Sequence, residues 1–136
     1  MWGTTVRAAT RAAPATVWAL LADPARWTEW DPALVGAAGQ VARGARIRTR
    51  TRSGRTAHLK VVLCEPGLAM ADRQRLPLAR ATVTRSVQPA PDGSEVTLQV
   101  RFTGIFGRLW WRVVGARVTT GLAAQAKGIA AAAERG

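Results

Sequence analysis

Two residues of opposite charge, Asp72 and Arg85, stand where an alternating strand pattern places apolar side chains. Asp72 is in phase with Leu68, Met70 and Leu76. Arg85 is in phase with Val83 and Val87. A carboxylate or guanidinium group removed from water needs a partner or a shifted pKa. If both side chains face the interior, they can pair with each other or bind carbonyl groups of a ligand, so they are the candidate catalytic residues. The alternative is that edge curvature or a bulge turns them toward solvent.

The other candidates for chemistry are weaker. His58 shares a predicted strand face with Lys60 and is expected to face solvent, which argues against a role as general base. Cys64 lies on the same predicted face and lacks an evident basic partner that would lower its thiol pKa. One cysteine and one histidine cannot supply the usual zinc site, so we expect no metal and no cofactor.

The length and composition indicate one globular domain spanning residues 1–136. The hydrophobic content is 48%, and no apolar run approaches the roughly 18 residues of a transmembrane helix. The N-terminal stretch lacks the apolar segment of a signal peptide, so we expect a cytoplasmic protein. Whether the protein is a monomer or a homodimer stays open.

The net charge of +12 is carried almost entirely by arginine, because only two of the 20 basic residues are lysines. Arginine and alanine, which is also abundant, both have G/C-rich codons, so a biased genome can produce this excess. We therefore expect no nucleic-acid partner. A less favoured alternative is that Arg46, Arg48, Arg50 and Arg52, which share one face of a predicted strand, form a platform for an acidic partner or nucleic acid.

The order of the predicted elements is unusual. Residues 3–11 alternate as a strand, Pro14 begins a helix over 14–22, and Asp23 caps a second short helix that starts at Pro24. Residues 33–103 alternate between turns about ten residues apart, which is typical of an antiparallel meander. Its predicted strands include 45–52, 57–63, 68–76 and 79–88, and a turn at 89–93 precedes the last strand.

Periodicity then predicts which side chains face the core. Ile47, Leu59, Leu98 and Phe102 lie on the apolar faces of their strands. A helical repeat follows through residue 134, with an apolar stripe formed by Trp111, Val114, Val118, Leu122, Gln125 and Ile129. Gln125 could orient a ligand by hydrogen bonding, or it could lie at the hydrated border of the stripe. Three glycines weaken this helix by up to about 1 kcal/mol each and could permit close packing: Gly115, Gly121 and Gly128.

The stretch AAPATVWALLADPARWTEWDP resembles the opening of the START-like, polyketide cyclase/dehydrase (SRPBCC) superfamily, with its pattern A-x-P-x-x-VW…D-x-x-x-W-x-x-W. The segment RFTGIFGRLWWRVVG and the long helix after it are similar to that superfamily's ending. The resemblance implies an α+β helix-grip fold. In this fold a curved antiparallel sheet of about seven strands has two short helices after the first strand, and a long C-terminal helix packs across it.

The same resemblance implies an apolar cavity beneath the long helix. At the corner after Asp23, Trp18, Trp27 and Trp30 would close one end of the cavity, and Trp27 or Trp30 could instead stack on a planar ligand. The expected ligand-binding residues are Trp27, Trp30, Ile47, Leu59, Met70, Val83, Leu98, Phe102, Trp111, Val118, Leu122 and Gln125.

Members of the superfamily bind lipids, polyketides, plant hormones or other hydrophobic molecules, and some cyclise or aromatise a poly-β-ketone. The resemblance therefore implies a partner that is a hydrophobic small molecule, with possible cyclisation or dehydration of a polyketide-type substrate. The chain differs from superfamily members that have more groups suited to acid–base catalysis, because it has no tyrosine and no histidine expected to face inward. A non-catalytic carrier or sensor of a hydrophobic metabolite is the alternative.

Overall fold

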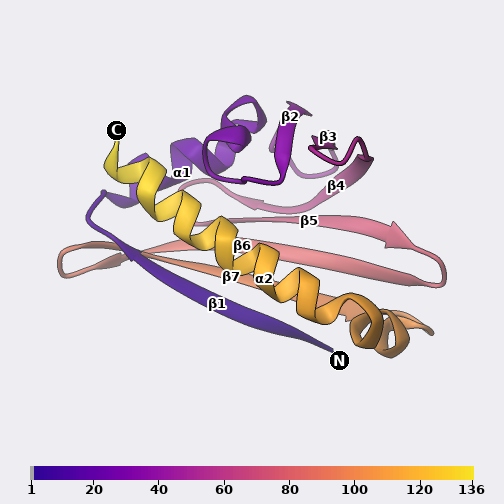
Figure 1. Ribbon diagram of the computed structural model, residues 1–136. Helices are drawn as coiled ribbons and strands as arrows, with labels where there is room; N and C mark the ends of the chain where they lie inside the picture. The colour runs from indigo at the N-terminus through magenta and orange to yellow at the C-terminus, as the bar shows by residue number, and fades with distance from the viewer. Residues whose placement is uncertain (1) are drawn as a thin grey trace.

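A computed structural model describes residues 2–136, and these form one curved antiparallel sheet with three helices on its inner face (Figure 1). The spatial order of the strands is β1-β7-β6-β5-β4-β3-β2. Apart from β1, each strand therefore lies beside its neighbour in sequence. The strands are β1 (Trp2–Thr10), β2 (Leu34–Gly39), β3 (Arg46–Thr51), β4 (Thr56–Glu65), β5 (Ala69–Leu76), β6 (Ala79–Ala90) and β7 (Gly93–Thr103).

Two short helices, α1 (Pro14–Ala22) and the 3₁₀ helix η1 (Pro24–Glu29), connect β1 to β2. Pro14 and Pro24 each begin a helix, where the missing proline N–H costs no hydrogen bond. Asp23 separates the helices, and its carboxylate accepts a hydrogen bond from the Ala25 amide at 3.1 Å. The predicted corner at Asp23 is thus confirmed.

The long helix α2 (Gly107–Glu134) crosses the inner face and packs mainly against β1 and β7 (Figure 1). Its C-terminal half is the more deeply buried, and there Gly128 allows the closest approach. A Cβ at this position would overlap the backbone carbonyl of Trp30. Gly121, by contrast, has open space where a Cβ would stand. Among residues 2–136, neither α2 nor any other helix has the length and apolarity required to cross a bilayer.

The strand register places the two candidate charged residues on the inner face. Met70 lies opposite Arg85 on β6, and Asp72 lies opposite Val83. Arg85 in turn lies opposite buried Leu98 on β7. Because directly opposed residues share a face, Asp72 and Arg85 point toward α2 as diagonal neighbours. The alternative that curvature turns them outward is excluded.

A bulge in β4 corrects one part of the predicted pattern. The register shifts between Val61 and Leu63, so that Val61 lies opposite Asp72 but Leu63 lies opposite Ala71. Past the bulge the parity is reversed. Leu63 therefore leaves the apolar face on which regular alternation places it, and Cys64 turns inward to pack against the core.

Two smaller corrections concern the ends of strands. β6 continues through Pro89 and Ala90, which lie opposite Ser94 and Gly93, so the turn predicted at 89–93 is confined to two residues. Leu68, predicted in phase with the inner residues of β5, precedes that strand in the turn after β4 and is 45% exposed.

Candidate functional site

A buried polar cluster lies where the centre of the sheet faces α2. The Arg85 guanidinium donates through Nη1 to Asp72 Oδ2 at 2.6 Å, and the side chains are only 6% and 4% exposed. The Gln125 side-chain oxygen, on α2, accepts from Arg85 Nη2 at 3.0 Å and from Nε at 3.3 Å. Three residues that are distant in sequence thus form one hydrogen-bonded group. Gln125 itself is half-buried, and its side-chain oxygen is directed at Arg85.

Two tryptophans from η1 and its end cover this cluster. The guanidinium carbon of Arg85 lies 5.4 Å from the ring centroids of both Trp27 and Trp30. The two rings are 5.6 Å apart and tilted by 53°. Their indole N–H groups donate to the backbone carbonyls of Leu21 and Leu20, which fixes both rings against α1. Each contact between a desolvated cation and an aromatic face contributes up to about 2 kcal/mol.

Asp31 is a second buried carboxylate near Arg85. The residue is only 8% exposed, and its Oδ1 accepts from the Ala33 amide at 3.0 Å. Burial raises the pKa of the Asp31 carboxyl above its ordinary value, while that hydrogen bond and the positive charge of Arg85 act in the opposite direction. In the sequence this residue resembles an ordinary turn residue before proline, and only its burial distinguishes it.

The inner face is closed at one end and accessible at the other. Around Trp27, Trp30 and the C-terminal half of α2, the inward side chains are fully buried. Toward the β5–β6 turn, Val83 and Leu59 are only half-buried. Gln74, opposite Ala81 on the same face, is exposed. Solvent therefore reaches the inner face of β4, β5 and β6, which α2 does not cover because it packs mainly over β1 and β7.

The expected ligand-binding residues come together on this inner face. Those that are fully buried form the packed part of the interior: Trp27, Trp30, Ile47, Met70, Leu98, Phe102 and Leu122. The half-buried ones line its accessible part: Leu59, Val83, Trp111 and Val118. Gln125, the remaining expected residue, accepts a hydrogen bond from Arg85. Whether a ligand binds there, and whether Asp72 and Arg85 take part in catalysis, remain predictions.

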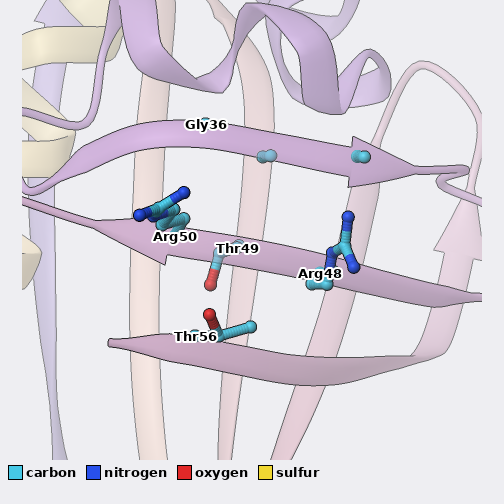
Figure 2. A pocket seen from close by; sticks show the side chains of 7 residues that line it. Gly36, Arg48, Thr49, Arg50 and Thr56 are labelled. Atoms are coloured by element: carbon cyan, nitrogen blue, oxygen red, sulfur yellow. The ribbon is translucent and has the colours of Figure 1, made fainter. Parts of the chain in front are cut away.

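The best-defined pockets of the described chain open elsewhere on the surface. One of about 450 Å³ lies along β2, β3 and β4, where Arg48 and Arg50 project from β3 and Thr56 lies opposite Arg50 on β4 (Figure 2). Another of about 330 Å³ is lined by basic residues of the outer face, among them Arg46 and Lys60. Of the expected ligand residues, only Leu59 borders either pocket. These hollows hold cationic side chains and lack the aromatic corner.

Of the two weaker candidates for chemistry, His58 lies on the predicted strand face and Cys64 does not. His58 is exposed and lies opposite Arg48 on β3. Cys64 is half-buried, because of the bulge, and its thiol donates to the Val41 carbonyl at 3.5 Å. Within residues 2–136, no group of three or more His, Cys, Asp or Glu side chains is arranged to hold a metal ion.

A seven-stranded curved antiparallel sheet with a long C-terminal helix across it defines a helix-grip protein. The chain belongs to the family described as "Polyketide cyclase / dehydrase and lipid transport", whose model matches residues 1–134. A search of curated proteins found no match.

Solved structures share the fold at low sequence identity. The Zhui aromatase/cyclase from a Streptomyces species superposes with a TM-score of 0.80 at 15% identity, over 98% of this chain and 94% of that one. A protein from Mesorhizobium loti gives 0.79 at 18% identity, over 98% of both chains. The two-domain aromatase/cyclase BexL gives 0.76 at 20% identity, over 95% of this chain and 46% of its own.

Proposed function

We propose that the protein binds a hydrophobic, carbonyl-bearing small molecule on the accessible inner face between α2 and strands β4, β5 and β6. The observation that supports this most strongly is the Asp72–Arg85–Gln125 cluster at the deep end of that face. A buried ion pair is seldom better for stability than well-packed apolar side chains. A charged group held in an otherwise apolar interior is therefore a candidate for function.

The geometry of Arg85 suits recognition of a carbonyl oxygen. A guanidinium group has five N–H donors, and those of Arg85 are directed at Asp72, Gln125 and the Met70 thioether. These contacts use four donors, so one Nη2–H is left for a ligand. The apolar part of the ligand would rest on Leu59, Val83 and Val118, whose partial exposure leaves apolar surface to be covered.

The same arrangement supports a cyclisation with loss of water. Arg85 would donate to the oxygen of an enolate formed when a base removes a proton from the carbon beside a carbonyl group. Asp31, whose pKa burial raises, is the nearby carboxylate suited to accept that proton. The enolate carbon would bond to a second carbonyl carbon of the same chain, and the oxygen of that carbonyl would take the proton from Asp31 and become a hydroxyl group. Asp31 would then remove a second proton from the attacking carbon as hydroxide leaves, so that a C=C bond forms and the proton and hydroxide are released as water. Asp72 and Gln125 would position the Arg85 guanidinium.

The family description and the aromatase/cyclase names of two fold neighbours, Zhui and BexL, favour this substrate class. A carrier would use the same inner face without turnover. The two are distinguished by incubating the protein with a linear diketone that closes to a six-membered enone and following the enone's ultraviolet absorbance. Acceleration that disappears in the folded double variant Asp72→Leu/Arg85→Met supports the cyclase, and binding without acceleration supports the carrier.

Binding itself is tested with a neutral dihydroxyanthraquinone and tryptophan fluorescence. The variant Val83→Trp fills the inner face. We expect it to abolish the saturable quenching of tryptophan fluorescence by the dihydroxyanthraquinone. Thr82→Trp is the matched control, because the neighbouring residue of β6 lies opposite Arg73 on the outer face and should leave binding unchanged. Equal affinity in both variants would place the probe elsewhere and contradict the proposed site.

A further inference from the structure

Five exposed apolar side chains gather at the end of the molecule where α2 begins; we call them the apolar tip. They are Leu78, Ile105, Phe106, Leu109 and Val113, and their exposed fractions run from 42% to 82%. Leu78 forms the β5–β6 turn, Ile105 and Phe106 connect β7 to α2, and the last two continue along α2 at spacings of four residues (Figure 1). Leu109 and Val113, four residues apart, lie on one side of α2, and Ile105 stands in the turn just before its first residue.

The loops of the tip are held together by hydrogen bonds. The Phe106 amide donates to the Leu78 carbonyl at 3.0 Å, and the Trp110 indole N–H donates to the Pro77 carbonyl at 3.0 Å. Leu78 has a φ of 55°, which an L-residue other than glycine, asparagine or aspartate seldom adopts. A strained leucine whose side chain is 60% exposed contributes little to the core. The backbone thus holds apolar side chains in water, which points to a partner surface.

The charged side chains around the tip are all cationic. Arg75 and Arg80 lie directly opposite each other across β5 and β6, just before the turn at Leu78. Together with Leu78 and Ile105 they line a shallow pocket. Arg108 and Arg112 are exposed on the first turns of α2. No Asp or Glu occurs in residues 73–91 or 96–133, and Asp92 and Glu95 lie by the β6–β7 turn at the opposite end of those strands.

This combination selects among the possible partners. A second copy docked tip to tip would bring like charges together. Nucleic acid would match the positive charge, but four of the five side chains of the tip are branched aliphatics, which neither stack on bases nor hydrogen-bond to them; only Phe106 can stack. An anionic bilayer matches both features, because aliphatic side chains enter the acyl region while arginines bind lipid phosphates. Trp110, half-buried beside the tip, is of the type enriched at bilayer interfaces.

We propose that the apolar tip, with Arg75, Arg80, Arg108 and Arg112 around it, is a docking surface for membranes that contain anionic phospholipid. The protein would attach at the interface without spanning the bilayer. The inner face opens toward the same end of the sheet, so an attached molecule would present that opening to the lipid.

The test is flotation of the full-length protein with vesicles of phosphatidylcholine alone or with a third of the lipid replaced by phosphatidylglycerol. We expect binding to the anionic vesicles that weakens with salt. Ile105→Ser/Leu109→Ser should lower it by at least about tenfold, because two apolar side chains lose their insertion. Arg75→Gln/Arg80→Gln should lower it by about tenfold or more, because each basic residue near the surface contributes separately.

Two control variants match these changes away from the tip. Val35→Ser removes a side chain that is 51% exposed on β2, and Arg43→Gln/Arg55→Gln removes two exposed arginines from other loops. The apolar control should bind like the wild type, and the charge control should lose much less than Arg75→Gln/Arg80→Gln. Equal losses in both charge pairs would show adsorption by net charge and overturn the proposal. So would vesicle binding unchanged in Ile105→Ser/Leu109→Ser, or tip-dependent binding to soluble polyglutamate, which indicates an acidic protein partner.

Discussion

Replacing only one of Asp72 and Arg85 should lower the free energy of unfolding far more than replacing both. Asp72→Leu leaves the guanidinium buried with Gln125 as its main acceptor, and Arg85→Met leaves the Asp72 carboxylate buried at 3% exposure. Each single change should lower the free energy of unfolding by about 3–5 kcal/mol, as expected for an uncompensated buried charge. Arg85→Met also removes the cation from both tryptophan rings, so it should be the larger of the two.

The double variant Asp72→Leu/Arg85→Met should recover most of this loss and come within about 2 kcal/mol of the wild type. Leucine and methionine are apolar, and methionine is flexible enough to fill the space over Trp27 and Trp30. Urea unfolding followed by tryptophan fluorescence measures all four proteins, because both rings adjoin the substituted positions. The coupling is the difference between the double change and the sum of the single changes.

A surface pair provides the control for that cycle. Arg7 and Glu95 approach to 3.9 Å with side chains 63% and 48% exposed. The corresponding cycle, Arg7→Met and Glu95→Leu, should show a coupling below about 1 kcal/mol. If the losses at Asp72 and Arg85 simply add, or if each is as small as those at the surface pair, then the two side chains are hydrated and the account of a buried cluster is wrong.

Two further predictions concern the helix contact and the second carboxylate. Gly128→Ala should destabilise the protein, since a Cβ there overlaps the Trp30 carbonyl, whereas Gly121→Ala in the same helix should stabilise it by up to about 1 kcal/mol in thermal unfolding. For Asp31 the folded state has the higher pKa, so wild-type stability falls as pH rises through that pKa. Asp31→Asn should therefore gain stability over the wild type toward pH 7 and lose that advantage below about pH 4, in urea unfolding across this range. A constant difference across pH would contradict this cause.

Much of the fold could be predicted because its boundaries rest on local chemistry. Proline at the first position of α1 and η1, the Asp23 cap, and strict alternation in β3 each restrict the backbone by short-range interactions. The bulge in β4 could not be predicted, because VVLC alternates equally well in either parity and only pairing with β5 decides it. The exchange of Leu63 and Cys64 followed from that single extra residue.

The polar cluster was partly visible in the sequence because a charge in phase with apolar residues needs a partner. Asp72 and Arg85 could be predicted as candidate site residues for this reason, and helical spacing predicted Gln125 as a third. Asp31 could not be predicted in this way, because a turn residue is normally hydrated and the burial of Asp31 depends on how η1 packs. The apolar tip could not be predicted either, because the exposure of Leu109 depends on which side of α2 the sheet covers, and that of Ile105 on how the turn before α2 folds.

The proposed function places a hydrophobic, carbonyl-bearing molecule on the inner face beside Arg85. Intermolecular nuclear Overhauser effects between the dihydroxyanthraquinone and methyl-labelled protein locate the probe directly. The account predicts contacts to methyl groups of Leu59, Val83 and Val118, which solvent reaches on that face. Contacts confined to Leu78, Ile105 and Val113 at the apolar tip, or to Val35 on β2, would contradict it.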